Sequence, residues 1–158
     1  MKLAERLGGI ASRVPLGVRV LDVGTDHGFI PIFLALQGSA ARLYASDVAV
    51  GPLNAARKNA AKYGVGDAIA FHLADGIPPA LAPELDCVIV AGMGGETITG
   101  ILERAESALP AGTLLILQPQ TKTDVLLAHL NARGYSDLRL AEVTEGRRKY
   151  VIVTARKG

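Results

Sequence analysis

The chain has 158 residues, of which 49% are hydrophobic and 20% charged, and its formal net charge is +2. This length suits one domain with a hydrophobic core, so we expect residues 1–158 to form a single domain. No apolar run is long enough to cross a membrane, and residues 1–14 alternate charged and apolar side chains, as an amphipathic helix does and a signal peptide does not. With one cysteine, Cys87, the composition predicts a cytoplasmic protein.

Strand-like and helix-like patterns alternate along the rest of the chain. Short β-branched or aliphatic runs predict strands, and apolar residues spaced for one face predict helices. The expected elements are a strand over 19–23, a helix over 30–36, a strand over 42–46, a helix over 50–63, strands over 69–73 and 85–90, a helix over 96–109, a strand over 113–118, a helix over 122–132, and strands over 137–143 and 150–155.

This alternation predicts the fold class. Repeated strand–helix units favour a parallel sheet with helices on both faces. The last two strands, joined through Glu145 and Gly146, indicate an antiparallel hairpin. The expected fold is therefore α/β and similar to the Rossmann-like methyltransferase fold, with a seven-stranded, mostly parallel sheet that ends in a C-terminal antiparallel hairpin.

The first predicted strand leads into a glycine-containing turn, VLDVGTDHG over residues 20–28. Gly24 and Gly28 permit a tight turn and allow a ligand to approach the backbone. Their spacing is Gly-x-x-x-Gly, so the Gly-x-Gly-x-x-Gly pattern that binds a dinucleotide pyrophosphate is absent. This argues against a nicotinamide dehydrogenase and favours S-adenosylmethionine, which has no pyrophosphate.

Acids lie at the ends of the first three predicted strands, where open α/β sheets bind ligands. Asp22 is suited to the cationic amino-acid end of a cofactor, Asp47 to two ribose hydroxyls, and Asp75 to an adenine amino group. Each alone could be a turn or cap residue. Three acids at the ends of successive strands together favour a nucleoside-binding site.

The fourth predicted strand leads into a glycine-rich segment over residues 92–95. Backbone nearly free of side chains would let a flat base pass close to a transferred methyl group. The alternative is a loop that needs positive φ.

The C-terminal residues 133–158 carry seven basic and three acidic side chains. This basic end suits an anionic partner such as RNA, and a solvated charged hairpin is the alternative.

Five motifs in this order, LDVGTDHGFIP, VGPLNAARKN, ADGI, VAGMGGETI and LILQPQ, resemble the bacterial tRNA (adenine-N1)-methyltransferase family TrmK, which acts on position 22 of tRNA. The resemblance extends from Arg6 to Tyr150. It implies that S-adenosylmethionine and tRNA are bound. The implied cofactor residues are Asp22, Gly24, Asp26, Gly28, Asp47, Asp75, Gly76 and Gly92; the residues expected to face the base are His27, Gly92, Met93, Gly94, Gly95, Gln118 and Pro119; and Arg6, Arg147 and Arg148 are expected to contact RNA.

Methylation of adenine N1 needs alignment of the nitrogen with the methyl group and the sulfur more than it needs a general base, because N1 has a free lone pair at neutral pH. Gln118 could accept a hydrogen bond from the positively charged methylated base. His27 could orient the base or cap the following helix. These two are the catalytic candidates. N1 lies on the pairing edge, so the target must be unpaired or flipped. No metal site is expected, and the oligomeric state is open.

The sequence also departs from the family. Family members usually continue into a helical C-terminal extension that helps to hold tRNA, whereas this sequence ends at Gly158, and Gln120 stands where the family has Asn. A methyltransferase with another RNA, protein or small-molecule substrate, and a cofactor-binding module without turnover, are the alternatives. AGMGG lacks the Asn/Asp-Pro-Pro-Tyr/Phe motif, which argues against exocyclic amino targets.

Overall fold

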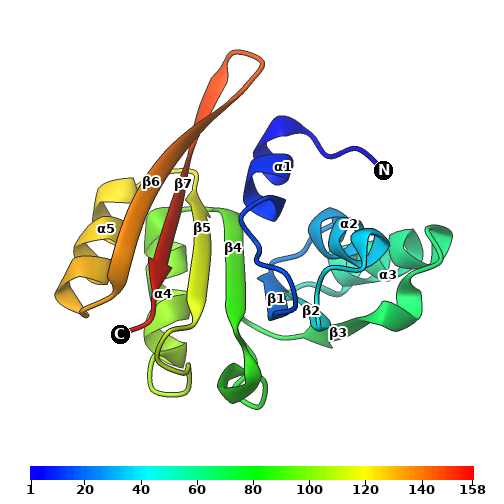
Figure 1. Cartoon of the computed structure of the whole chain (residues 1–158), viewed down its shortest axis with the longest axis horizontal. Helices are drawn as coiled ribbons and strands as arrows, with labels where there is room; N and C mark the ends of the chain where they lie inside the picture. The colour runs from blue at the N-terminus through cyan, green and yellow to red at the C-terminus, as the bar shows by residue number, and fades with distance from the viewer.

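The computed structural model describes residues 1–158 and contains one seven-stranded sheet with the strand order β3-β2-β1-β4-β5-β7-β6 (Figure 1). Strands β1 to β5 pair in parallel, and β7 pairs antiparallel with both β5 and β6. The predicted fold is therefore confirmed. The strands are β1 (Arg19–Val23), β2 (Arg42–Asp47), β3 (Ile69–Leu73), β4 (Cys87–Met93), β5 (Leu114–Pro119), β6 (Ser136–Glu145) and β7 (Arg148–Arg156).

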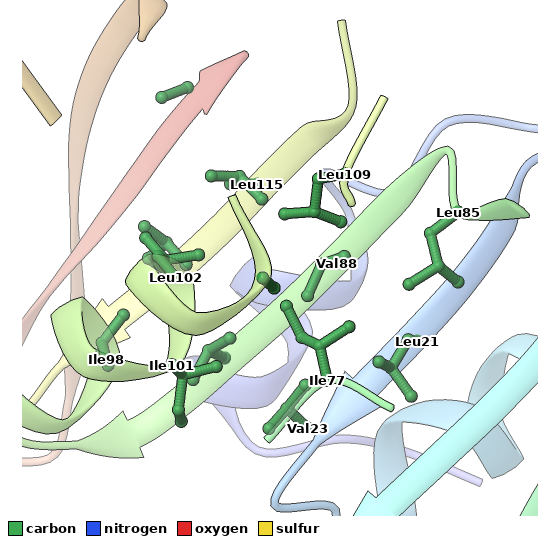
Figure 2. Packing of buried hydrophobic residues seen from close by; sticks show 14 of the residues in the cluster. Leu21, Val23, Ile77, Leu85, Val88, Ile98, Ile101, Leu102, Leu109 and Leu115 are labelled. Carbon is green, nitrogen blue, oxygen red and sulfur yellow. The ribbon is translucent and has the colours of Figure 1, made fainter. Parts of the chain in front are cut away.

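Helices cover both faces of this sheet. One buried cluster joins the sheet to α4 and α5, as Figure 2 shows for Ile98, Ile101 and Leu102 of α4 against Val88 and its neighbours. A second cluster joins the opposite face to α1 and α2, with α3 at its edge. The helices are α1 (Glu5–Ala11), α2 (Phe29–Gln37), α3 (Val50–Lys62), α4 (Gly95–Ala105) and α5 (Thr123–Ala132), with short 3-10 turns at η1 (Gly66–Ala68) and η2 (Ala82–Glu84).

Strand β4 lies at the centre and is buried on both faces. Val88 and Val90 belong to the cluster under α4, whereas Cys87 and Ile89 belong to the cluster under α1 and α2. Both faces therefore require apolar side chains, which explains the unbroken apolar run in the sequence. No helix has the length and apolar character needed to cross a membrane.

Three predicted elements have a boundary that was wrong by three or more residues. The N-terminal helix covers only Glu5–Ala11 rather than residues 1–14, with Ala4 and Ser12 as its caps. Pro15 disfavours helical backbone at Val14, so the helix does not extend to this residue. Strand β4 continues through Gly92 and Met93, which the sequence placed in a loop, and a bulge between Ala91 and Met93 allows this. Helix α4 ends at Ala105, four residues earlier than expected.

The β6–β7 hairpin extends beyond the rest of the sheet, and α1 lies beside it (Figure 1). A Cβ atom on Gly9 would lie 2.9 Å from Cγ2 of Val143 in β6. The helix and the hairpin are therefore in close contact, which only a residue without a side chain permits at this position.

We expect Leu102→Ala to lower the free energy of unfolding by about 2–5 kcal/mol, because this side chain is fully buried in the α4 cluster. Leu140→Ala is the matched control, since 54% of Leu140 is exposed. Urea denaturation measures both. Equal losses would show that the α4 face is not the packed core described here.

Candidate functional site

A cavity of about 550 Å³ opens at the carboxyl ends of β1, β2 and β4 and beside the loop after β3. Parallel strands bring these ends to one edge, which is where open α/β sheets bind ligands. The cavity brings together ten of the residues predicted from the sequence: Arg6, Asp22, Gly24, Asp26, His27, Asp47, Asp75, Gly76, Gly92 and Met93.

The turn after β1 has an unusual backbone. Gly24 has a φ of 65° and Asp26 a φ of 55°, so both lie in the left-handed region, which is uncommon for a residue with a side chain. The Asp26 amide donates to Oδ2 of Asp47 at 3.1 Å, and the Ala49 amide donates to Oδ1 at 3.0 Å. Asp47 therefore fixes two loops at once, and each of its oxygens retains a lone pair for a ligand.

Asp22 is a buried acid at the bottom of the cavity, with 6% of its surface exposed. Burial raises the pKa of Asp22 to about 7, although the hydrogen bond from the Thr25 hydroxyl, 2.8 Å long, acts in the opposite direction. Asp22 forms no ion pair within 4.0 Å. Its carboxyl group therefore suits a cationic ligand group.

Asp75 and Gly76 form the wall beyond β3. The Asp75 side chain is largely exposed and lies 3.4 Å from the Arg104 guanidinium, an exposed pair that is worth little in stability. The buried Ser46 hydroxyl donates to the Gly76 carbonyl at 3.1 Å, which fixes this wall relative to β2. Asp75 thus remains available to a ligand.

Gln118 is fully buried at the end of β5 and does not line the cavity. Its Oε1 atom accepts from Nη1 of Arg6 at 3.0 Å and from the Gly92 amide at 3.2 Å, and its Nε2 atom donates to the Pro119 carbonyl at 3.1 Å. The expected direct contact between Gln118 and a substrate base is therefore not supported, because its acceptor oxygen is already occupied.

His27 lies at the rim of the cavity with 56% of its side chain exposed. Its ring stacks on Phe29 with a centroid separation of 5.5 Å and an interplanar angle of 27°. The N-cap of α2 is Gly28, and no side chain caps this helix. The interpretation of His27 as a helix cap is therefore wrong, and an exposed aromatic pair stands at the rim instead.

Besides Gln118, six predicted site residues lie outside the cavity. Gly28 packs against Ala56 in α3, and a Cβ atom added to Gly28 would lie 3.0 Å from Cβ of Ala56. Gly95 is buried at the start of α4, where a side chain would overlap the Lys122 carbonyl. The geometry therefore gives both a packing role. The six are Gly28, Gly94, Gly95, Pro119, Arg147 and Arg148.

The sequence analysis also missed lining residues. Several are apolar or small and carry no chemical signal in the sequence, and Phe29 and Val48 are exposed hydrophobic residues, which only the structure can reveal. Gln120 was noted as a departure from the family pattern and lines the cavity. Lining residues that the sequence analysis did not predict include Thr25, Phe29, Ile30, Val48, Pro52, Thr97, Ile101 and Gln120.

Residues 3–153 match a family model described as a methyltransferase domain. The chain belongs to this methyltransferase family. The predicted resemblance to the TrmK branch of methyltransferases is also confirmed by relatives that align along the whole chain.

Three relatives illustrate this likeness. The tRNA (adenine(22)-N(1))-methyltransferase of Bacillus subtilis (strain 168) is 29% identical over 158 residues, which are 100% of this chain and 66% of that protein, so the chain spans just under two thirds of its length. A Streptococcus pneumoniae protein in complex with S-adenosyl-L-methionine is 31% identical over 97% of this chain and 72% of that chain, with a TM-score of 0.86. TrmK of M. capricolum in complex with S-adenosyl-homocysteine is 26% identical over 100% of this chain and 70% of that chain, with a TM-score of 0.88.

We expect Asp22→Asn to change the pH dependence of stability of the free protein. Because the pKa of Asp22 is raised to about 7 in the folded state, the folded protein holds a proton that the unfolded chain has lost above about pH 4. This group therefore lowers stability by up to about 1.4 kcal/mol per pH unit as the pH rises toward 7.

The Asn variant lacks this contribution, so the free energy of unfolding of the variant minus that of the parent should increase between about pH 4.5 and 6.5. Urea denaturation at several pH values gives the difference curve, in which groups common to both proteins cancel. A flat difference curve would show that Asp22 ionises normally in the folded protein.

Proposed function

We propose that this chain transfers a methyl group from S-adenosylmethionine to N1 of the adenine at position 22 of tRNA, in the cytoplasm. The observation that carries the proposal is the convergence of Asp22, Asp47 and Asp75 on one cavity beside the Gly92 bulge. The family and the named activity of the Bacillus subtilis relative support the choice of reaction.

The cavity fits the cofactor by the chemistry of its donor set. Asp22 offers a buried carboxyl group to the ammonium of the amino-acid end, and Asp47 offers two carboxylate oxygens to the ribose hydroxyls. Asp75 and the backbone at Gly76 form the wall for the adenine ring. The end of the Met93 side chain packs against Gly24, and the positive φ of Gly24 favours a glycine at this turn in the cavity lining.

S-adenosylmethionine supplies the methyl group in an activated, positively charged form. The adenine N1 atom already has a lone pair, so the protein needs no general base to create the nucleophile. The task left to the residues is to align N1 with the methyl group, an effect that reaches roughly 7–11 kcal/mol in favourable cases. The Gly92 bulge, which carries no side chain, lets the base approach.

The rim suits a flipped base. His27 and Phe29 present a stacked aromatic surface, and stacking on an aromatic side chain is worth about 1–3 kcal/mol per base. Gln120 is exposed and lines the cavity. Its amide oxygen is therefore better placed than that of Gln118 to accept a hydrogen bond from the methylated base. We therefore assign to Gln120 the role that the sequence analysis gave to Gln118.

We expect incubation with tRNA and S-adenosylmethionine to produce N1-methyladenosine, measured by mass spectrometry of nucleosides. A transcript with guanine in place of adenine at position 22 is the control and should gain no methyl group. Methylation of both transcripts would contradict the position. S-adenosylmethionine binding without methylation of any tRNA would favour a different substrate or a module without turnover.

The hairpin supplies the basic surface expected to meet the RNA. Arg147 and Arg148 lie exposed at its tip. We expect the Arg147→Ala/Arg148→Ala double variant to bind tRNA more weakly and to reduce the slope of log affinity against log salt by up to about two. Cofactor affinity should be unchanged, because neither residue lines the cavity.

Lys58→Ala/Lys62→Ala is the matched control, since it removes equal charge from the exposed surface of α3. Filter binding at several salt concentrations measures all three proteins. Equal slopes for the two double variants would show that only total charge matters and that the hairpin is a solvated surface.

A further inference from the structure

His27 lies in a tight turn with left-handed backbone on both sides. The Gly28 amide donates to the Thr25 carbonyl at 2.9 Å and closes this turn. Asp26 and Gly28, which flank His27, have φ values of 55° and 74°. Such backbone persists at a residue with a side chain only where the surrounding contacts hold it. The position of the His27 ring at the rim of the cavity therefore depends on what holds this turn.

Strand β2 holds the first half of the turn. The Thr25 amide donates to the Ser46 carbonyl at 2.9 Å, and the Asp26 amide donates to Oδ2 of Asp47 at 3.1 Å. These two hydrogen bonds end before His27. The residue that presents its side chain at the rim therefore needs a separate support.

Asn59 of α3 supplies this support. Its Nδ2 atom donates to the His27 carbonyl at 2.9 Å, and no backbone amide donates to this oxygen. Helix α2 offers no donor to it, because the residue four positions further along is Pro31, which has no N–H group. Since the Gly28 amide is also bonded, both ends of the peptide group that follows His27 are fixed.

Close packing of α3 on the turn makes this hydrogen bond possible. Gly28 packs against Ala56, where an added Cβ atom would lie 3.0 Å from Cβ of Ala56. Ala56 and Asn59 are three positions apart in α3 and therefore lie on the same face of the helix. One face of α3 thus contacts the turn through a glycine and holds it through an amide.

Fixing this peptide group also fixes the direction in which the His27 side chain leaves the backbone. In that position the ring stacks on Phe29, and 56% of the side chain is exposed. Exposed aromatic rings that line a cavity suit a planar base. We propose that Asn59 is a positioning residue for methyl transfer, which holds His27 so that the His27–Phe29 pair meets the target base. This role rests on the proposed function.

A general brace for the whole cavity is the other role open to Asn59. Two features favour the narrower role. Asn59 does not line the cavity. Asp22 and Asp47 belong to β1 and β2, so parallel strand pairing holds them without Asn59. Loss of the amide should therefore disturb the presentation of the base and leave cofactor binding intact.

Asn59→Ala removes the donor to the His27 carbonyl. We expect its kcat/KM for tRNA to fall roughly 3- to 10-fold, which corresponds to the loss of one hydrogen bond. Its affinity for S-adenosyl-homocysteine, measured by isothermal titration calorimetry, should be unchanged. Asn54→Ala is the matched control, because Asn54 is exposed on the same helix, does not line the cavity and gains the same helix propensity. This control should keep the kcat/KM of the parent.

A double-mutant cycle with His27→Ala tests whether Asn59 acts through the His27 ring. Without the ring there is no side chain to orient, so Asn59→Ala should lower kcat/KM no further in the His27→Ala background. The carbonyl at position 27 remains, so the change in Tm caused by Asn59→Ala should be the same in both backgrounds. An equal fall in kcat/KM in both backgrounds would overturn the positioning role, and so would a parallel loss of S-adenosyl-homocysteine affinity.

If Asn59→Ala does not fold, Asn59→Asp takes its place in the same cycle, because it keeps the volume of the side chain and loses the N–H donor. If the parent methylates tRNA and the Asn59 variant retains the parent's kcat/KM, Asn59 has no positioning role. If the parent methylates no tRNA, the proposed function fails, and the positioning role fails with it.

Discussion

Strand β1 pairs in parallel with β2 on one side and with β4 on the other, and this double pairing determines the geometry of the site. Parallel pairing brings the carboxyl ends of all three strands to one edge of the sheet. Asp22 and Asp47 reach the same cavity because Asp22 pairs with Ala45 and Asp47 follows two residues later. A shift of one residue in this register would turn Asp22 to the opposite face.

The carboxyl ends of β1 and β5 place polar side chains where burial is costly. Asp22 is almost fully buried without an ion-pair partner, and Gln118 is fully buried with its oxygen shared by two donors. The two differ in physical consequence. Gln118 is satisfied within the protein and therefore rigidifies its surroundings. Asp22 is satisfied only in part, so a ligand cation stabilises it, and the free protein bears the cost of a shifted pKa.

The strands of the sheet, and ten of the residues that line the cavity, could be anticipated from the sequence for a physical reason. The strands, the helices and the acids at strand ends follow from hydrophobic periodicity and from turn chemistry, which are local signals. The roles of Gly95 and Gln118 could not be predicted, because they depend on contacts with Lys122 and Arg6, which lie 27 and 112 positions away. A glycine needed for packing and a glycine needed for a ligand look identical in the sequence.

The contact between Arg6 and the β6–β7 hairpin shapes the wall of the cavity that contains Arg6. Arg6 and Glu145 are 139 positions apart, yet they are joined by a hydrogen bond beside the cavity. The wall of the cavity that contains Arg6 is therefore completed only when α1 docks on β6, which requires the close approach that Gly9 permits. The tip that carries Arg147 and Arg148 belongs to the same hairpin. The surface proposed to meet RNA and the arginine in the wall of the cavity thus both depend on the hairpin, so a change that loosens α1 from the hairpin should disturb both.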